Sequence, residues 1–186
     1  MKTLRSSLQE KIAFLRLKSG DSEAFGFFYD KYVKNIYRFI YIKVTNRQLA
    51  EDLTQEVFLK VWQHLVDKKN IKSFQAFIFR IARNSVVDHY RASNSQELPL
   101  EYISELADMS KSITTEVDKS IDAAVLLQEI RKLKPEYQEV LILRYIEDLS
   151  IDDISDVMQK DKNNIRVTLH RALNKLKQII QEKNNR

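Results

Sequence analysis

The sequence is short of the residues that build disulfides, metal sites and tight turns. Its 186 residues include no cysteine, two glycines, two prolines and three histidines. Without cysteine, neither a disulfide framework nor a thiolate metal site can form. The histidines, His64, His89 and His170, lie too far apart in sequence to suggest a ligand set, so no metal and no cofactor is expected. Strand-rich folds need more turn residues than these, and the composition therefore predicts an all-α fold.

Long hydrophobic runs and glycine-rich loops are also missing. No segment is apolar for long enough to cross a membrane, and residues 1–20 lack the uncharged apolar run of a signal peptide. We therefore expect a cytoplasmic protein without membrane insertion. The acidic residues form no clustered catalytic or metal site in the sequence, and no glycine-rich phosphate loop occurs. The chain is accordingly not predicted to be an enzyme, and no catalytic residue is assigned.

Charge divides the chain into three parts. Residues 1–93 contain 17 Lys and Arg against nine Asp and Glu, whereas residues 94–120 contain two against six. From residue 160 onward, eight basic residues stand against two acidic ones. A strongly basic terminal helix indicates either a polyanionic partner or a solvated helix face, and charge alone leaves both open.

Apolar periodicity predicts three helices in the first half of the chain. The segments over 21–44, 49–65 and 73–91 carry apolar or aromatic residues every three or four positions, which places these side chains on one face of each helix. Asp21 is expected to cap the first of these helices. Together they predict a small N-terminal domain over residues 1–93.

The helical pattern breaks after this domain. Residues 94–120 are rich in Ser, Thr and acids and contain Pro99, which is typical of a flexible linker. Helical spacing then resumes at residue 121. The sequence thus predicts two small helical domains, over 1–93 and 121–186, joined by an acidic linker over 94–120.

The C-terminal domain contains a helix-turn-helix pattern. A support helix is expected over 136–146, followed by a short helix over 150–158 in which Ser150 and Asp153 form a capping-box pattern. A polar turn over 159–164 leads to a long basic helix. Such a helix fits the major groove of DNA, where side chains near its N-terminus meet base edges. The alternative is an ordinary helical hairpin, but the crowding of basic residues on the last helix favours DNA.

Three segments together resemble a known family. Residues 133–177, LKPEYQEVLILRYIEDLSIDDISDVMQKDKNNIRVTLHRALNKLK, resemble the −35-reading domain of extracytoplasmic-function sigma factors, a group within the sigma-70 superfamily. Residues 50–65, AEDLTQEVFLKVWQHL, resemble the family's polymerase-binding helix, and residues 74–91, FQAFIFRIARNSVVDHYR, its −10-reading helix. The segments occur in the family's order, with an acidic linker between them. The resemblance implies a sigma factor that binds core RNA polymerase and promoter DNA, with an anti-sigma factor as a further possible partner.

The resemblance also implies site residues in each segment. Polymerase contact is implied for Asp52, Gln55 and Glu56. Contact with the −10 element is implied for Phe77, Arg80, Arg83, Asn84 and Arg91, of which Phe77 and Asn84 would hold an extruded base. Contact with the −35 element is implied for Arg166, His170, Arg171 and Lys175. A core position is an alternative role for Phe77, and a solvated helix face is an alternative for the three arginines on the −10-reading helix.

The sequence departs from the family pattern at three points in the helix-turn-helix. Asp148 stands where the family usually has Gly, and Asn163–Asn164 stand where its turn usually has Gly-Thr. Because Asn tolerates the left-handed conformation well, we expect the turn to survive with these asparagines. Val167 replaces a frequent Ser, which leaves the promoter sequence undefined but not the fold.

Rival functions belong to other classes. A stand-alone helix-turn-helix regulator would share the DNA-binding unit but would usually carry a ligand pocket or a dimer domain, and no segment resembles one. An enzyme acting on nucleic acid would need a clustered carboxylate or metal site. A helical adaptor would bind protein only.

Overall fold

A computed structural model of the chain describes residues 2–19, 21–66, 71–93 and 126–184. Within these ranges the regular elements are helices, without a strand, so the prediction of an all-α fold is confirmed. The chain divides into two compact units, Met1–Leu98 and Pro99–Arg186. The predicted linker, 94–120, lies outside the described residues. Among the helices that are described, none combines the length and apolar character needed to span a membrane.

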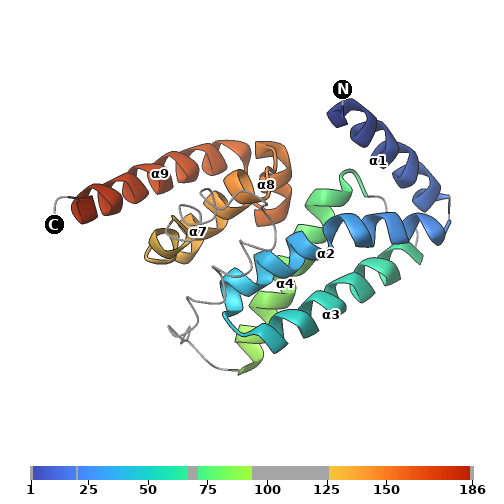
Figure 1. The fold of residues 1–186 in the computed structure, drawn as a ribbon, viewed down its shortest axis with the longest axis horizontal. Coiled ribbons are helices and arrows are strands. Elements are labelled where there is room, and N and C mark those ends of the chain that lie inside the picture. Colours follow the sequence, from blue (N-terminus) through green and yellow to red (C-terminus); the bar gives the residue numbers. More distant parts are fainter. Residues whose placement is uncertain (1, 20, 67–70, 94–125, 185–186) are drawn as a thin grey trace. The chain divides into compact units, whose positions relative to one another are not determined.

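In its described residues the N-terminal unit contains four helices (Figure 1). These are α1 Lys2–Lys18, α2 Glu23–Val44, α3 Arg47–Val66 and α4 Phe74–Ser93. Helices α2, α3 and α4 pack against one another, and α1 packs on α2 near its start. The sequence predicted α2, α3 and α4 but not α1.

Aromatic rings fill the centre of this unit. Phe28 is fully buried, and its ring centroid lies 4.1 Å from that of Phe74 on α4. The ring of Tyr32, one turn after Phe28, lies parallel to the Phe28 ring, with 6.4 Å between the ring centroids. Phe39 meets Phe79 edge-on at 5.4 Å. Large rings bury much apolar area per residue, so few side chains are enough to hold α2 against α4.

Short polar side chains set the limits of these helices. Asp21 Oδ1 accepts a hydrogen bond from the Glu23 N–H at 3.0 Å at the start of α2, as its predicted capping role requires. Thr45 ends α2 in the left-handed conformation, with φ 52°. Asn46 Oδ1 then accepts from the Leu49 N–H at 3.0 Å, which satisfies a free donor in the first turn of α3.

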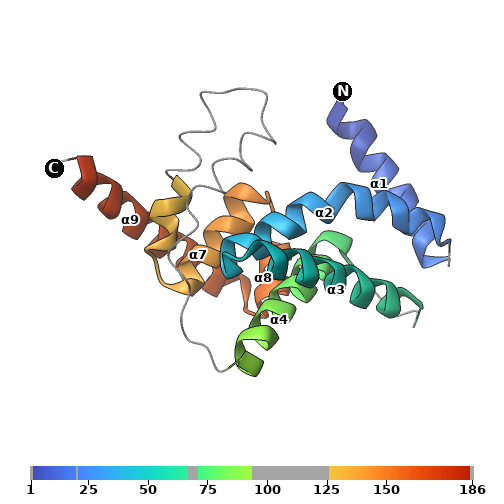
Figure 2. The same ribbon diagram turned by 60° about the horizontal axis from the view of Figure 1, so that its bottom comes forward.

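The described part of the C-terminal unit opens with helical residues over 126–131. It continues with α7 Pro135–Leu141, the π-helical turn η1 Ile142–Ile146, α8 Ile151–Met158 and α9 Lys162–Asn184. Pro135 occupies the first turn of α7, where its missing N–H costs nothing. Helices α7 and α8 both pack on α9, as Figure 2 shows from a second side. The centre of the unit is aliphatic: its fully buried side chains include Leu141, Ile142, Leu143, Leu149 and Ile154.

Among residues 126–184 of this unit, two that are not glycine adopt the left-handed conformation. Asp148, which stands where the family usually has Gly, has φ 52°, and Gln159 has φ 55°. The prediction that Asn163 and Asn164 would form the turn is wrong, because both lie within the first turn of α9. Their backbone N–H groups donate to Asp161 Oδ1 at 3.0 and 2.9 Å. A carboxylate at the N-terminus of a helix satisfies these donors, so the helix begins earlier than the sequence suggested.

Candidate nucleic-acid interface

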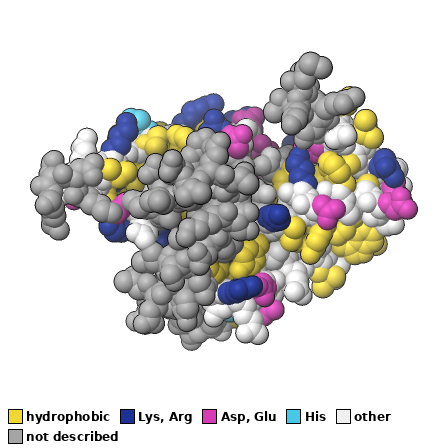
Figure 3. All heavy atoms as spheres, viewed as in Figure 1, with side chains coloured by type: hydrophobic (Ala, Val, Ile, Leu, Met, Phe, Trp, Pro, Cys, Tyr) yellow, Lys and Arg dark blue, Asp and Glu magenta, His cyan; other side chains and the backbone are white. Residues whose placement is uncertain are grey.

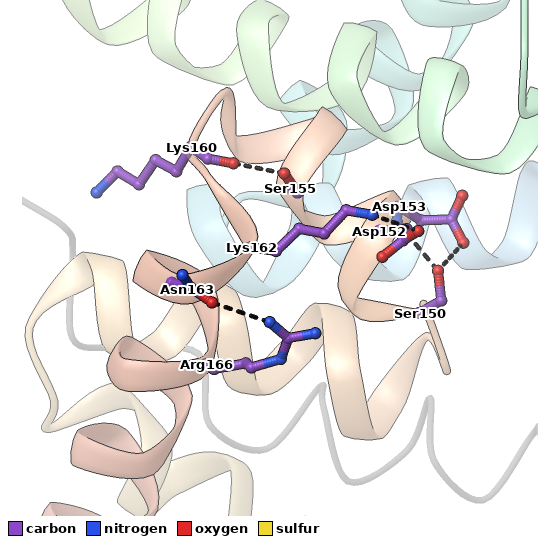
Figure 4. Close-up of polar contacts among 8 residues, drawn as sticks. All are labelled: Ser150, Asp152, Asp153, Ser155, Lys160, Lys162, Asn163 and Arg166. Atoms are coloured by element: carbon purple, nitrogen blue, oxygen red, sulfur yellow. Dashed lines mark hydrogen bonds and ion pairs between the residues drawn. The ribbon is translucent and has the colours of Figure 1, made fainter.

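The helix-turn-helix is held by short polar contacts at its turns (Figure 4). Ser150 Oγ accepts from the Asp153 N–H at 3.0 Å and donates to Asp153 Oδ2 at 2.6 Å. The predicted capping pattern at the start of α8 is therefore confirmed. Lys162 Nζ, at the start of α9, donates to Asp152 Oδ2 at 2.7 Å. Both contacts lie at the start of α8, and the second ties it to the start of α9.

Helix α9 has a buried side and a basic side. Ile165, Ala172 and Leu176 are buried against the rest of the unit. The four residues implied for −35 contact are all exposed on the remaining surface: Arg166, His170, Arg171 and Lys175. Lys and Arg side chains and a His stand along α9 in the space-filling view (Figure 3). The structure therefore exposes all four predicted residues on one helix, with Arg166 and His170 on one side of its exposed surface and Arg171 and Lys175 on the other.

Neighbouring polar groups orient these side chains. Arg166 Nη1 donates to Asn163 Oδ1 at 3.0 Å, one turn earlier on the same helix. The Asn174 side-chain nitrogen lies 3.4 Å from the His170 ring nitrogens, one turn later. Val167 is 48% exposed beside them, and an exposed aliphatic group in a major groove suits a thymine methyl. Sequence reasoning missed Asn163 and Asn174 as partners; their three- and four-residue spacing from Arg166 and His170 was the available signal.

An ion pair crosses the C-terminal unit. Lys160 Nζ, in the turn before α9, donates to Glu136 Oε1 in the first turn of α7 at 2.6 Å. The hydrogen bond from Lys160 lowers the pKa of the Glu136 carboxyl below its ordinary value, and Lys134, at 3.4 Å from the same carboxylate, adds to this. A hollow of about 380 Å³ lies beside the pair, and Tyr137 and Arg171 contribute to its lining. No periodic pattern in the sequence indicates this contact, because its partners are 24 positions apart.

Helix α4 presents the residues implied for −10 contact. Asn84 and Arg91 are exposed, while Arg80 and Arg83 are half-buried. Arg80, Asn84 and Arg91 are separated by four and seven positions, which places them on one face of the helix. The ring of Phe77 is only 7% exposed; it lies 5.5 Å from the His64 ring, and the Arg80 guanidinium lies 5.7 Å from its centroid. The structure thus groups the polar residues at the surface and places Phe77 in the core.

Helix α3 presents the residues implied for polymerase contact. Asp52, Gln55 and Glu56 are all exposed. Glu56 is ion-paired with Lys60, whose Nζ also donates to Ser85 Oγ on α4 at 3.1 Å. Leu59, one turn after Gln55, is 57% exposed on the same side of α3. The structure therefore adds an exposed leucine to the predicted acidic face, and its four-residue spacing from Gln55 was the signal that could have found it.

These features define a class of protein: a helical DNA-binding protein made of two units, one with a basic helix-turn-helix. Family models agree with this class. Sigma-70 region 2 matches residues 28–96, and Sigma-70, region 4 matches residues 123–176. The chain belongs to the extracytoplasmic-function sigma factors of the sigma-70 family.

Individual relatives support the same assignment. The chain is 32% identical over 167 residues to the ECF RNA polymerase sigma factor BldN of Streptomyces coelicolor, covering 89% of this chain and 63% of BldN. It is 27% identical over 180 residues to the ECF RNA polymerase sigma factor SigW of Bacillus subtilis, covering 90% of this chain and 94% of SigW. The solved structure of CnrH with the cytosolic domain of CnrY matches with a TM-score of 0.69 at 20% identity, over 94% of this chain and 98% of that one. At this identity the structural match supports the fold alone.

Proposed function

We propose that the protein is a sigma factor, which binds core RNA polymerase and directs promoter-specific transcription initiation. One observation carries the proposal: the chain matches sigma-70 region 2 and region 4 in that order, and the region 4 match contains a helix-turn-helix with exposed basic residues on α9. In this role the protein acts in the cytoplasm, where polymerase and DNA are found. It performs no catalysis of its own, because the polymerase supplies the chemistry.

The C-terminal unit recognises the −35 element in this proposal. Arg166 and His170 lie in the N-terminal half of α9, the part of a recognition helix that enters the major groove. The Arg166 guanidinium suits bidentate contact with guanine. Arg171 and Lys175 lie further along the helix and contact backbone phosphates, which fix register without reading sequence.

The N-terminal unit melts the −10 element. Asn84 is exposed, and its amide can hydrogen-bond the polar edge of an extruded base. Arg80, Arg83 and Arg91 contact phosphates along the same helix. Stacking of Phe77 on the extruded base stays a prediction, one that requires the ring to leave its buried position.

Polymerase binding is assigned to α3. Asp52, Gln55 and Glu56 form an exposed acidic and polar face that suits a basic partner surface. The acidic linker over 94–120 is predicted to thread the polymerase channel made for RNA, where its negative charge mimics nucleic acid. An anti-sigma factor is a further predicted partner of this chain. The solved complex with the cytosolic domain of CnrY was formed by CnrH.

Copurification tests the proposal against its rivals. The tagged full-length chain, added to bacterial lysate, is expected to retain the subunits of core RNA polymerase. The free protein should show only salt-sensitive, non-specific binding to DNA, because phosphate contacts dominate such binding. Tight, sequence-specific binding by the free protein without polymerase would favour the stand-alone regulator.

A further inference from the structure

Lys160 joins α8 to α9, the proposed recognition helix, and is held at three of its atoms. Its backbone N–H donates to the Ser155 carbonyl at 3.2 Å. Its carbonyl accepts from Ser155 Oγ at 2.5 Å (Figure 4), and its Nζ donates to Glu136 Oε1 on α7 at 2.6 Å. Two of these contacts come from α8. The contact with Glu136 comes from α7, so Lys160 connects three elements of the unit.

The residues on either side of Lys160 explain why its position matters. Gln159, immediately before it, is in the left-handed conformation with φ 55°. A non-glycine residue stays in that region only where the surrounding structure holds it there. Asp161, immediately after Lys160, accepts the hydrogen bonds from Asn163 and Asn164 that begin α9. The direction in which α9 leaves the turn is therefore set at residues 159–161.

The first two turns of α9 contain Asn163 and Arg166, of which Arg166 is predicted to read bases. Asn163 accepts the hydrogen bond from the Arg166 guanidinium at 3.0 Å, so the cap formed by Asp161 and the orientation of Arg166 belong to one connected set of contacts. A small rotation of this turn would move Arg166 relative to a base edge. Bidentate contacts with a base depend strongly on such geometry.

We propose that Glu136 is a positioning residue for the recognition helix: through Lys160 it fixes the turn from which α9 enters the groove, and so it sharpens the −35 preference. This inference rests on the proposed function. Glu136 is not placed in contact with DNA, and it acts through Lys160.

The ion pair is poorly suited to a purely stabilising role. The side chains of Glu136 and Lys160 are 32% and 36% exposed, and ion pairs with this exposure contribute little to folding. Ser155 still holds the backbone of Lys160 when the pair is removed. Loss of the pair should therefore leave the unit folded while allowing the turn more freedom.

The test uses holoenzyme, made from core RNA polymerase and the full-length chain. It compares open-complex formation on a promoter with the preferred −35 element against promoters that carry single −35 changes. Glu136→Gln and Lys160→Gln should each lower this discrimination about 3- to 10-fold, a range typical of residues coupled in one network. Lys160→Arg, which keeps the pair, should behave as the unchanged protein.

Asp21→Asn provides a matched control. Asp21 pairs with Arg16 at 2.7 Å in the N-terminal unit, and its carboxyl, like that of Glu136, has a pKa lowered by its basic partner. Its loss should not change −35 discrimination. Thermal unfolding of every variant shows whether the fold is kept.

The outcomes separate this inference from the proposed function. A folded Glu136→Gln variant with unchanged −35 discrimination would overturn the inference. An equal loss of open complexes on every promoter would also overturn it, because a positioning defect must change the ratio between the preferred promoter and the promoters with −35 changes. If holoenzyme made with the unchanged chain shows no −35 preference, the proposed function itself fails.

Discussion

Aromatic rings join the helices of the N-terminal unit, whereas branched aliphatic side chains join those of the C-terminal unit. In the first, Phe28 and Phe74 meet at 4.1 Å between ring centroids. In the second, Leu141, Ile142 and Leu143 are buried next to one another in sequence, where α7 passes into the π-helical turn. The N-terminal unit is thus held by a few large contacts between long helices. The C-terminal unit relies on a compact set of short elements joined by tight turns.

The predicted functional residues follow this difference. In the N-terminal unit all of them except the buried Phe77 lie on the outer faces of α3 and α4, whose inner faces build the core, so helix packing sets the direction of these faces. In the C-terminal unit they lie on α9, whose direction depends on the turn at Gln159–Asp161 and its polar contacts. Substitutions in the aromatic core of the first unit should therefore act through stability, whereas changes at the turn before α9 should act through the geometry of that helix.

The largest effect is expected from the aromatic core. Phe28→Ala should lower the free energy of unfolding of the N-terminal unit by about 3–5 kcal/mol, since it removes a fully buried ring. Trp62, the single tryptophan, lies on α3 beside Phe25 and so reports on this unit by fluorescence. Leu143→Ala should instead cost about 2–5 kcal/mol in the other unit. It should shift the circular dichroism transition while leaving the Trp62 transition in urea unchanged; a shift of both would contradict separate cores.

Reversing charge on the outer face of α3 should abolish polymerase binding without unfolding the unit. Asp52→Lys with Glu56→Lys is expected to lower the affinity for core polymerase at least 100-fold, because the partner surface is proposed to be basic. Helicity should be unchanged, since exposed substitutions rarely cost more than about 0.5 kcal/mol. Asp30→Lys, an exposed acid on α2, is the control and should bind normally. Normal binding by the double variant would make the acidic face a solvated surface only.

Two positions on α9 should separate base reading from phosphate contact. Arg166→Ala should cost about 1–3 kcal/mol and relax the preference at one or two −35 positions. Lys175→Ala should weaken all promoters alike and reduce the salt slope by about one unit. Binding of holoenzyme to a promoter library at two salt concentrations measures both. An unchanged −35 preference in Arg166→Ala would show that this part of α9 does not enter the groove.

Asn84→Ala should reduce open-complex formation more on duplex promoters than on templates already mismatched at −10. The mismatch removes the cost of unpairing, roughly a few kcal/mol, that base capture must offset. Measuring open complexes on both templates gives the comparison. Equal losses on both would assign Asn84 to binding or folding instead.

The smallest effect is expected from acid. Asp21 in one unit and Glu136 in the other have pKa values lowered by basic partners. A carboxyl with a lowered folded-state pKa contributes stability that is complete above its ordinary pKa and is lost as the pH falls through the lowered value. Both contributions should therefore disappear only in clearly acidic solution. Asp21→Asn should reduce the acid sensitivity of the Trp62 signal slightly and Glu136→Gln should not, as pH titration of unfolding would show.

The sequence predicted much of the fold because most helices bury a single regular stripe. It missed α1, where Ala13 and Leu17 are buried but Leu8, Ile12 and Leu15 are exposed on another side, so that no one apolar face stands out. The π-helical turn at Ile142–Ile146 was also missed, since its buried residues fit a helical pattern equally well. Capping at Asp21 and Ser150 was predictable because those contacts span two or three residues.

The exposure of the candidate site residues was predictable to a similar degree. The surface positions of Asp52, Asn84 and Arg166 follow from helical spacing, whereas their roles stay predictions. The burial of Phe77 could not be decided, because an aromatic side chain serves a core and a base-stacking site equally well. Contacts between distant segments, such as Glu136 with Lys160, leave no periodic trace in the sequence.

Transcription reconstituted from purified components tests the central claim most directly. Core RNA polymerase is mixed with the full-length chain and a library of linear duplex promoters, and the start sites of the transcripts are sequenced. We expect initiation at a defined subset of templates that share −35 and −10 elements, dependent on the chain and lost with Asp52→Lys/Glu56→Lys. Initiation no more selective than that of core polymerase alone would contradict the account.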